Sequence, residues 1–190
     1  KGAHHTLHDT VNRTPRGYRK MVSWNQYTKE NLDFEGSAMW IASTISWYYP
    51  RTVLEVGCNV GNNMKYLPAI SCHGVDSNKY SIEQGKKLNP HIKFKLADCR
   101  ALPYPASSFN LVFESGLFIH LGKNDALKTL DEMIRVSNNM VVSMYNEGRH
   151  GKEVPWRDSY YTVWDMQIFF KQKGLGILEC SQMPDFQNQK

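Results

Sequence analysis

The sequence has few cysteines, and their spacing suits neither a metal site nor a disulfide framework. Its 190 residues include four cysteines, none of them in a C-x-x-C pair. A domain of this size is stable without disulfides, so we expect a reducing, cytoplasmic environment and no bound metal. No apolar run approaches the roughly 18–20 residues that a membrane-spanning helix needs, and the N-terminus has no signal-peptide core. We therefore expect no membrane partner.

Outside the N-terminus, the chain also lacks an excess of charge of either sign. The net charge is +5, and the first 31 residues alone carry +4. A basic segment can indicate an acidic partner such as nucleic acid, but here the excess is confined to one end. The chain is 41% hydrophobic and 12% aromatic, which excludes disorder of the whole chain and fits one domain. We expect residues 1–34 to form a basic, aromatic arm and 35–190 a single domain.

Short apolar runs alternate with segments of helical periodicity along the rest of the sequence. The runs predict strands over 52–56, 74–76, 92–97, 109–113, 140–144 and 175–181. The periodic segments predict helices over 35–48, 62–69, 79–88, 124–137 and 162–173. Alternation of this kind is typical of βαβ units with right-handed crossovers. The fold class is therefore α/β, with a doubly wound, mostly parallel sheet.

Acidic residues stand at the ends of three successive predicted strands, at Asp76, Asp98 and Glu114. Ligands of such sheets bind outside the carboxyl ends of the strands, where the strand order reverses. Acids also cap the helices that follow strands, so one of them alone carries little information. Three acids together with a glycine-containing loop favour a ligand site.

That loop follows the first strand and places Gly57, Asn59 and Gly61 at alternate positions. Glycine and asparagine tolerate positive φ, and glycine lets a ligand approach the backbone closely. The helix predicted to follow would direct free N–H groups and its positive dipole end at the ligand. The dinucleotide fingerprint G-x-G-x-x-G is absent, because Asn59 and Asn62 stand at its second and third glycines.

Residues 55–61 read E-V-G-C-N-V-G, and they resemble motif I of the class I S-adenosylmethionine (SAM)-dependent methyltransferases. The likeness extends over about residues 50–145. It includes D-C-R-A-L-P at 98–103, similar to the family's D-x-x-x-L-P segment, and F-N-L-V at 109–112, similar to F-D-x-V with Asn110 in place of the Asp. The family resemblance implies a Rossmann-like methyltransferase domain, with SAM as cofactor and S-adenosylhomocysteine (SAH) as product.

The resemblance also implies roles for single residues. Asp76 would bind both ribose hydroxyls, and Asp98 would accept a hydrogen bond from the adenine amino group. The adenine would lie beside the Cys99 N–H. The remaining implied cofactor contacts are Glu55, Gly57, Asn59, Gly61, Ser77, Glu114, Trp24 and Tyr27; aromatic faces and carboxylates attract a sulfonium cation. Trp24 and Tyr27 are equally open to an interpretation as packing between the arm and the core.

A narrower resemblance concerns the acceptor. The segments 24–31 (W-N-Q-Y-T-K-E-N), 55–62 and 117–121 (L-F-I-H-L) look like the methylases associated with pseudaminic acid biosynthesis. That likeness implies a small, sugar-like or carboxylate-bearing acceptor. In this fold the N-terminal arm and the loops after the fourth and fifth strands cover the active site. The substrate residues expected there are Arg16, Tyr18, Arg19, Phe118, Tyr145, Arg149, Trp156 and Arg157, since arginine and aromatic groups suit an anionic or planar acceptor.

Methyl transfer is an in-line substitution, so the enzyme's main task is to place the acceptor. A hydroxyl or ammonium acceptor also needs a base, for which His120 and Glu114 are the candidates. We expect O- or N-methylation of a small molecule. Two alternatives stay open: methylation of RNA or protein, which the basic arm would serve, and non-catalytic binding of SAM or SAH. The D/N-P-P-Y signature of amino-group methylation on bases is absent after the fourth strand, where E-S-G-L stands.

Overall fold

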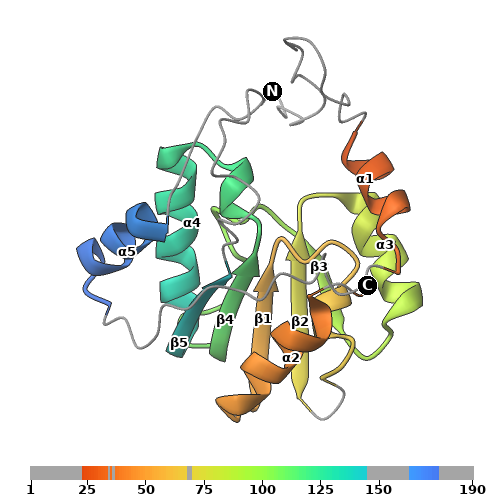
Figure 1. Ribbon diagram of the computed structural model, residues 1–190, viewed down its shortest axis with the longest axis horizontal. Helices are drawn as coiled ribbons and strands as arrows, with labels where there is room; N and C mark the ends of the chain where they lie inside the picture. Colours follow the sequence, from red (N-terminus) through yellow and green to blue (C-terminus); the bar gives the residue numbers. More distant parts are fainter. Residues whose placement is uncertain (1–22, 34, 36, 68–69, 145–162, 176–190) are drawn as a thin grey trace, which may run out of the picture.

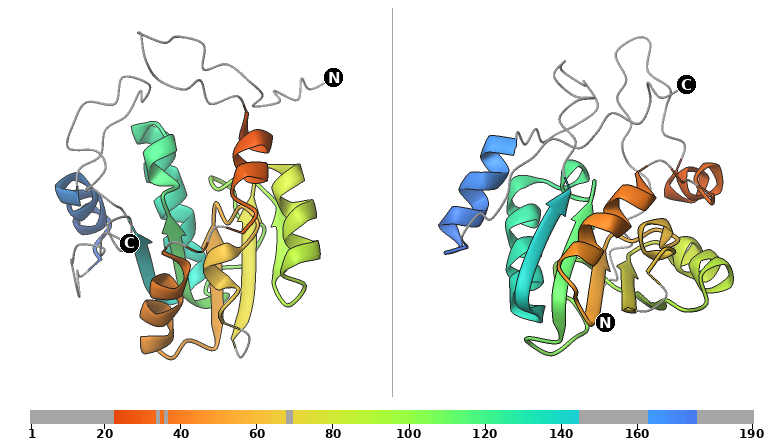
Figure 2. Two further views of the ribbon diagram at one scale, coloured as in Figure 1. Left: turned by 45° about the vertical axis from the view of Figure 1, so that its right-hand side comes forward. Right: turned by 60° about the horizontal axis from the view of Figure 1, so that its bottom comes forward.

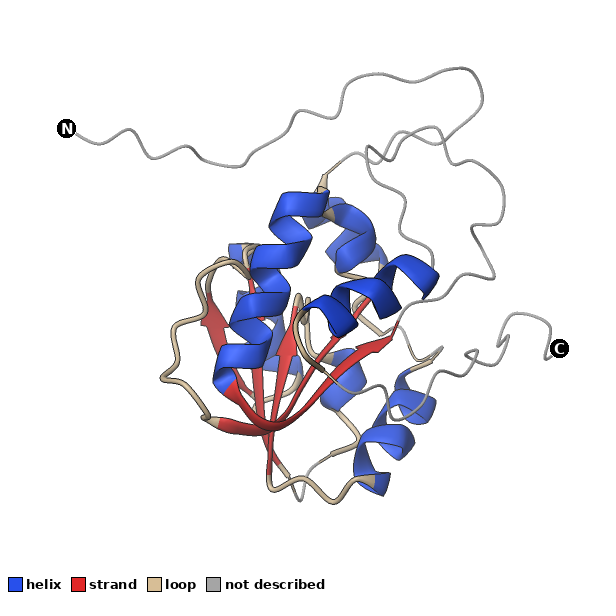
Figure 3. Cartoon of the chain, turned by 90° about the vertical axis from the view of Figure 1, so that its left-hand side faces the viewer, coloured by secondary structure: helices blue, strands red, loops and turns tan. Residues whose placement is uncertain are grey.

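Five parallel strands form a single sheet with helices on both faces (Figures 1 and 3). The computed structural model describes residues 23–33, 35, 37–67, 70–144 and 163–175. The strand order is β3-β2-β1-β4-β5, with neighbours in parallel register throughout. The strands are β1 (Thr52–Val56), β2 (Ser71–Asp76), β3 (Lys93–Leu96), β4 (Phe109–Ser115) and β5 (Ser137–Met144). The doubly wound fold predicted from the alternating pattern is confirmed.

The helices divide between the two faces of the sheet. They are α1 (Trp24–Glu30), α2 (Ala38–Trp47), α3 (Lys79–Leu88), α4 (Lys123–Val136) and α5 (Val163–Gln172), with 3₁₀ turns η1 (Asn62–Met64) and η2 (Phe118–His120). α2 and α3 cover one face, and α4 and α5 cover the other (Figure 2). No helix in the described part of the chain is long and apolar enough to cross a membrane.

The two faces are filled by alternate residues of the same strands. In β1, Val53 packs under α2 and Leu54 packs under α4, and neither is exposed. This follows from the period-2 geometry of a strand, which sends successive side chains to opposite faces. A strand buried on both faces is largely apolar, which is why β1 and β4 are mostly apolar; Glu55, Asn110 and Glu114 are the polar exceptions in their interiors.

Asn110, which stands where the family usually has an aspartate, holds the beginnings of β1 and β4 together. Its Oδ1 accepts hydrogen bonds from the N–H groups of Arg51 (3.0 Å) and Thr52 (3.2 Å), and its own N–H donates to Thr52 Oγ1 (2.9 Å). A neutral amide supplies the same acceptor oxygen as a carboxylate, so the replacement keeps this contact.

One expectation about local structure needs correction. The helix predicted over 62–69 is only the three-residue turn η1, because its two asparagines are poor helix formers. The helical part of the arm is α1, capped by Ser23, whose Oγ accepts from the Gln26 N–H at 3.1 Å. Residues 1–22 of the arm and 176–181 of the last predicted strand lie outside the described residues.

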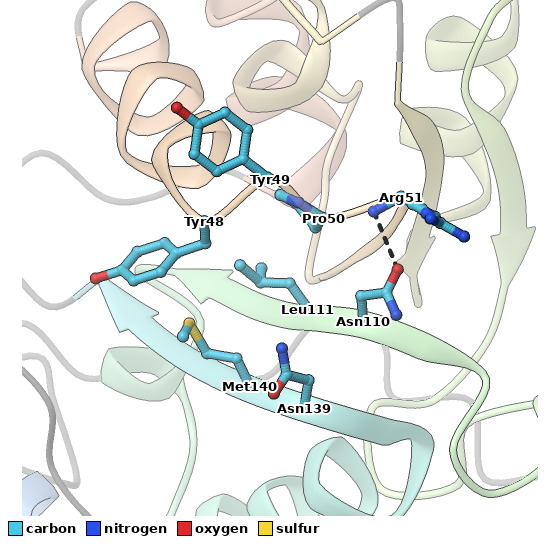
Figure 4. Close-up of a pocket in the computed structure, with 8 residues that line it drawn as sticks. All are labelled: Tyr48, Tyr49, Pro50, Arg51, Asn110, Leu111, Asn139 and Met140. Carbon is cyan, nitrogen blue, oxygen red and sulfur yellow. Dashed lines mark hydrogen bonds between the residues drawn. The ribbon is translucent and has the colours of Figure 1, made fainter.

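A pocket of about 330 Å³ opens at the amino ends of β1, β4 and β5, beside the end of α2 (Figure 4). Its lining is Tyr48, Tyr49, Pro50, Arg51, Asn110, Leu111, Asn139 and Met140. It therefore lies at the opposite end of the strands from Asp76 and Glu114. Ligands of doubly wound sheets bind at the carboxyl ends, so this pocket is not the candidate functional site.

Candidate functional site

The candidate site lies at the carboxyl ends of β1 and β4, where the strand order reverses. From β1 the chain continues outward to β2 and β3, and the other half of the sheet runs from β4 to β5. The glycine loop, residues 57–61, follows β1. Asp76 and Glu114 lie at the carboxyl ends of β2 and β4. α1 lies at this same end of the sheet, to which the strand arrows point (Figure 1). The sequence prediction placed the site at this edge.

The glycine loop has the backbone conformation that its sequence predicts. Gly57, Asn59 and Gly61 have φ values of +75°, +48° and +83°. The N–H groups of Gly57 and Cys58 both donate to the Val75 carbonyl, at 2.8 and 3.0 Å, which binds the loop to the end of β2. The loop is therefore held in a left-handed turn that glycine and asparagine accommodate.

Gly61 is required for packing as well as for its backbone angle. A Cβ built at Gly61 would stand 2.8 Å from Phe94 Cζ and 2.8 Å from Ile92 Cδ1. Both of those side chains are buried, at 7% and 4% exposure. This glycine therefore lets β3 pack beneath the loop, a role that the motif alone does not reveal.

Asp76 connects the loop to the second crossover. Its Oδ2 accepts from the Asn59 N–H at 2.9 Å and its Oδ1 from the Asn78 N–H at 2.8 Å. Each carboxylate oxygen has about two acceptor positions, so each keeps one for a ligand hydroxyl. Burial raises the pKa of Asp76, and the surrounding N–H groups oppose that shift. Ser77, the next residue, is exposed.

Glu55 is buried beneath the loop with one oxygen that lacks a partner. Only 1% of the residue is exposed. Oε1 accepts from the Asn63 side-chain amide, whereas Oε2 has no hydrogen-bond partner among the residues that the structure describes. Burial raises the pKa of Glu55 to about 8, and the nearby charges of Asp76 and Glu114 add to the shift. A buried carboxyl with an unpaired oxygen is suited to receive a cation.

Asp98 forms an ion pair that the sequence analysis did not anticipate. Arg100 Nη2 lies 2.6 Å from Asp98 Oδ2, and Arg100 Nη1 lies 3.1 Å from Asp125 of α4. The hydrogen bonds from Arg100 lower the pKa of Asp98. Cys99 is half-buried, and its sulfur accepts from the Thr129 hydroxyl at 3.3 Å. Arg100 therefore fixes the orientation of the carboxylate expected at the adenine.

Glu114 and His120 belong to one turn after β4. Glu114 is buried, and its Oε2 accepts from the N–H groups of Leu117 (2.7 Å) and Phe118 (3.3 Å). His120 is exposed, and its ring meets the Trp24 ring edge-to-face, with 4.9 Å between centroids. Trp24 also lies edge-to-face with Tyr27, at 5.8 Å. The structure thus brings His120 together with both aromatic residues of α1.

Phe118 corrects the predicted set of substrate residues. It has no exposed surface and packs in the core beneath α4, so it does not line an acceptor pocket. The other predicted substrate residues lie outside the described residues: Arg16, Tyr18, Arg19, Tyr145, Arg149, Trp156 and Arg157. Within the described ranges, no three His, Cys, Asp or Glu side chains are grouped so as to hold a metal ion.

The family model of a methyltransferase domain matches residues 53–139 of this chain. The match spans β1 to the start of β5 and includes the glycine loop and all three strand-end acids. Residues 53–139 therefore form a methyltransferase domain. The resemblance inferred from motif I is thereby confirmed.

Named relatives of this methyltransferase domain support the assignment. Ajmaline N-methyltransferase of Rauvolfia serpentina is 31% identical over 97 residues, which are 46% of this chain and 33% of the relative. Phosphoethanolamine N-methyltransferase 1 of Arabidopsis thaliana is 25% identical over 103 residues, 50% of this chain and 21% of the relative. The chain thus spans a third or less of the length of these two relatives.

A solved structure shares the fold of the methyltransferase domain. Magnesium protoporphyrin IX methyltransferase of Synechocystis PCC 6803, solved with bound SAM, aligns with a TM-score of 0.64. The alignment covers 84% of this chain and 79% of the other, at 13% identity. At this identity the likeness shows the fold alone.

The residues of the site fit SAM, the cofactor of the family. Its ammonium group would neutralise the unpaired Glu55 Oε2, which otherwise has no partner in the interior. Asp76 keeps one acceptor position on each oxygen, as two ribose hydroxyls require. The carboxylate acceptors of the site are therefore complementary to the cofactor's cationic and hydroxyl groups.

Proposed function

We propose that the chain catalyses methyl transfer from SAM to an oxygen or nitrogen atom of a small, anionic or sugar-like acceptor. The observation that supports this most directly is the buried, unpartnered oxygen of Glu55 below a left-handed glycine loop. A carboxyl group kept without a partner in a folded interior costs free energy, and that cost is offset when a cation binds.

When bound, SAM supplies a methyl group activated by its sulfonium, ready for in-line displacement. The chain's own residues then have to hold and orient the reactants. Asp76 would hold the ribose, Glu55 the ammonium, and Asp98, fixed by Arg100, the adenine amino group. Trp24 and Tyr27 belong to α1, which lies at the same end of the sheet, and their rings would stabilise positive charge there.

His120 suits the role of proton acceptor better than Glu114. Glu114 Oε2 accepts hydrogen bonds from the backbone N–H groups of Leu117 and Phe118, which belong to the turn that carries His120. Glu114 would therefore position that turn, while the exposed imidazole of His120 would accept the acceptor's proton. Methylation of an already nucleophilic acceptor would not require this step.

The relatives favour a small-molecule acceptor. Two are named for phosphoethanolamine and for ajmaline, and neither name refers to a polymer. The excess positive charge lies in residues 1–31, and this arm leads into α1 at the proposed site. An anionic acceptor would be complementary in charge to residues 1–31.

Glu55 leads to a prediction about protons. At pH 7 a carboxyl with a pKa of about 8 is mostly protonated, and an ammonium bound beside it favours the ionised form. Binding of SAM at pH 7 should therefore release about one proton, and its affinity should rise as the pH increases toward 8. Calorimetry in two buffers of different ionisation enthalpy measures this release. Glu55→Gln keeps the shape of the side chain and should abolish it; wild-type binding without proton release would contradict the role of Glu55.

The acceptor class can be tested with methyl-labelled SAM. The whole chain would be incubated with a panel of sugars, carboxylic acids, amines and RNA, and we expect label only in small molecules. Label only in RNA, falling steeply as salt increases, would refute the small-molecule proposal. Binding of SAH without transfer to any member of the panel would favour a non-catalytic binding protein.

A further inference from the structure

α1 is attached to the methyltransferase domain through a polar residue. Thr28 is the buried residue of this seven-residue helix, at 1% exposure, whereas Trp24 and Tyr27 are 44% and 43% exposed. α1 packs beside α3 at the carboxyl end of the sheet (Figures 1 and 2). A helix this short has little stability of its own, so its position depends on such contacts.

Thr28 is at the centre of a hydrogen-bond cluster formed by three segments of the chain. Its Oγ1 lies 2.9 Å from Asn59 Oδ1 in the glycine loop and 2.7 Å from Ser81 Oγ in α3. The Asn59 oxygen can only accept, so Thr28 donates to it and the Ser81 hydroxyl donates to Thr28. The Trp24 carbonyl, 3.0 Å away, competes for the same Thr28 proton.

The acceptor of this bond exists because the loop carries asparagine, and not glycine, at position 59. Asn59 has a φ of +48°, which glycine would adopt without strain. Glycine would have no side chain to receive Thr28. The backbone N–H of the same Asn59 donates to Asp76, the proposed ribose ligand. One residue thus contacts α1 with its side chain and the proposed cofactor ligand with its backbone.

At its other end, α1 reaches the turn after β4. Trp24 lies against the His120 ring with 4.9 Å between centroids. A further hydrogen bond joins the C-terminal end of α1 to Asn62, the residue after the glycine loop. The Asn62 side-chain amide donates to the Asn31 carbonyl at 2.9 Å. α1 therefore spans from the proposed cofactor loop to the proposed proton acceptor.

We propose that Thr28 is a positioning residue that couples the glycine loop to α1. Through Asn59, the cofactor-bound state of the loop determines how firmly α1 holds Trp24 against His120. The acceptor side of the site is then completed after the cofactor binds, which imposes an order of binding. This inference rests on the proposed function for its cofactor, and on the Thr28 contacts for its mechanism.

Hydrogen exchange of the whole chain, followed by mass spectrometry, tests the coupling. In the free chain, Thr28→Val should speed exchange of the peptide spanning 23–31 by about tenfold, because the hydrogen bonds of the buried hydroxyl to Asn59 and Ser81 are lost. Saturating SAH should slow exchange of that peptide in the wild type and leave it unchanged in Thr28→Val. Exchange over β1 should stay at the wild-type rate, which shows that the variant is folded.

Matched variants separate the hydroxyl group from general loosening. Thr28→Ser keeps the donor and should match the wild type within about twofold, as should the exposed Asn25→Gln on the same helix. Asn59→Gly should speed exchange of α1 as Thr28→Val does, and the double variant should be no faster than either one. The proposal would be overturned if α1 exchanged at the wild-type rate in Thr28→Val. It would also be overturned if α1 exchanged as fast in Thr28→Ser as in Thr28→Val.

The role of SAH is judged separately. If SAH binds the wild type but leaves α1 exchange unchanged, the coupling is wrong although the cofactor assignment stands. If SAH does not bind the wild type at all, the proposed function fails. The attachment of α1 through Thr28 is then decided by the variants of the free chain alone.

Discussion

Asp76→Ala should weaken the binding of SAH by about 100-fold, the largest effect on the cofactor expected of a single substitution in this site. The change would remove the two charge-assisted bonds that we propose Asp76 makes to the ribose hydroxyls. It also removes the acceptor of the Asn59 and Asn78 N–H groups, which hold the glycine loop and the start of α3. Isothermal titration calorimetry of the whole chain with SAH measures the change.

Glu83→Gln is the matched control for Asp76→Ala. Glu83 is also an acidic residue, but it is exposed on α3 and forms an ion pair with Lys79, with 3.8 Å between Oε1 and Nζ. Ion pairs on the surface contribute little to stability, so the affinity of the Glu83→Gln variant for SAH should stay within about twofold of the wild type. An unchanged affinity in Asp76→Ala would remove the basis of the cofactor assignment.

Gly61→Ala should lower the free energy of unfolding by about 2–5 kcal/mol. Alanine at a φ of +83° costs about 1–2 kcal/mol, and its methyl group would meet Phe94 and Ile92 at 2.8 Å, which adds about 1–3 kcal/mol of overpacking. Chemical denaturation of the wild type and the variant measures the difference.

Gly174→Ala separates the two contributions to the Gly61 effect. Gly174 has a φ of +75°, close to that of Gly61, but a Cβ there would meet none of the described residues within 4 Å. Its substitution should therefore cost only the backbone term, about 1–2 kcal/mol. Equal losses in the two variants would contradict the packing role assigned to Gly61.

The sequence predicted the sheet more accurately than it predicted the loop that follows it. β1 and α3 have the predicted bounds, because a run buried on both faces and a helix capped by Asn78 both leave clear local signals. The helix predicted over 62–69 was wrong because two asparagines disfavour a helix there, despite the apolar periodicity of the segment. Here η1 buries Met64 in the core without forming a full helix.

The site was predictable where function depends on strand ends, and unpredictable where it depends on contacts between distant residues. Asp76, Asp98 and Glu114 follow strands, so the fold class alone brings them together. Thr28 gave no signal, since it lies 31 residues from Asn59 and 53 from Ser81. Phe118 was misassigned because aromatic residues line acceptor pockets and fill cores alike; its burial was decided by how the turn after β4 packs under α4.

The short turn η1 also bears on selectivity among adenosine compounds. A full helix beginning at the glycine loop would attract phosphate through its dipole, as it does in nucleotide-binding proteins. Three residues of 3₁₀ turn provide almost none of that field, and Glu55, Asp76 and Glu114 surround the same place with acidic groups. ATP and the dinucleotides share the adenine and ribose of SAM but bring anionic oxygens where SAM brings an ammonium and a sulfonium. The acidic groups at this site would therefore disfavour ATP and the dinucleotides relative to SAM.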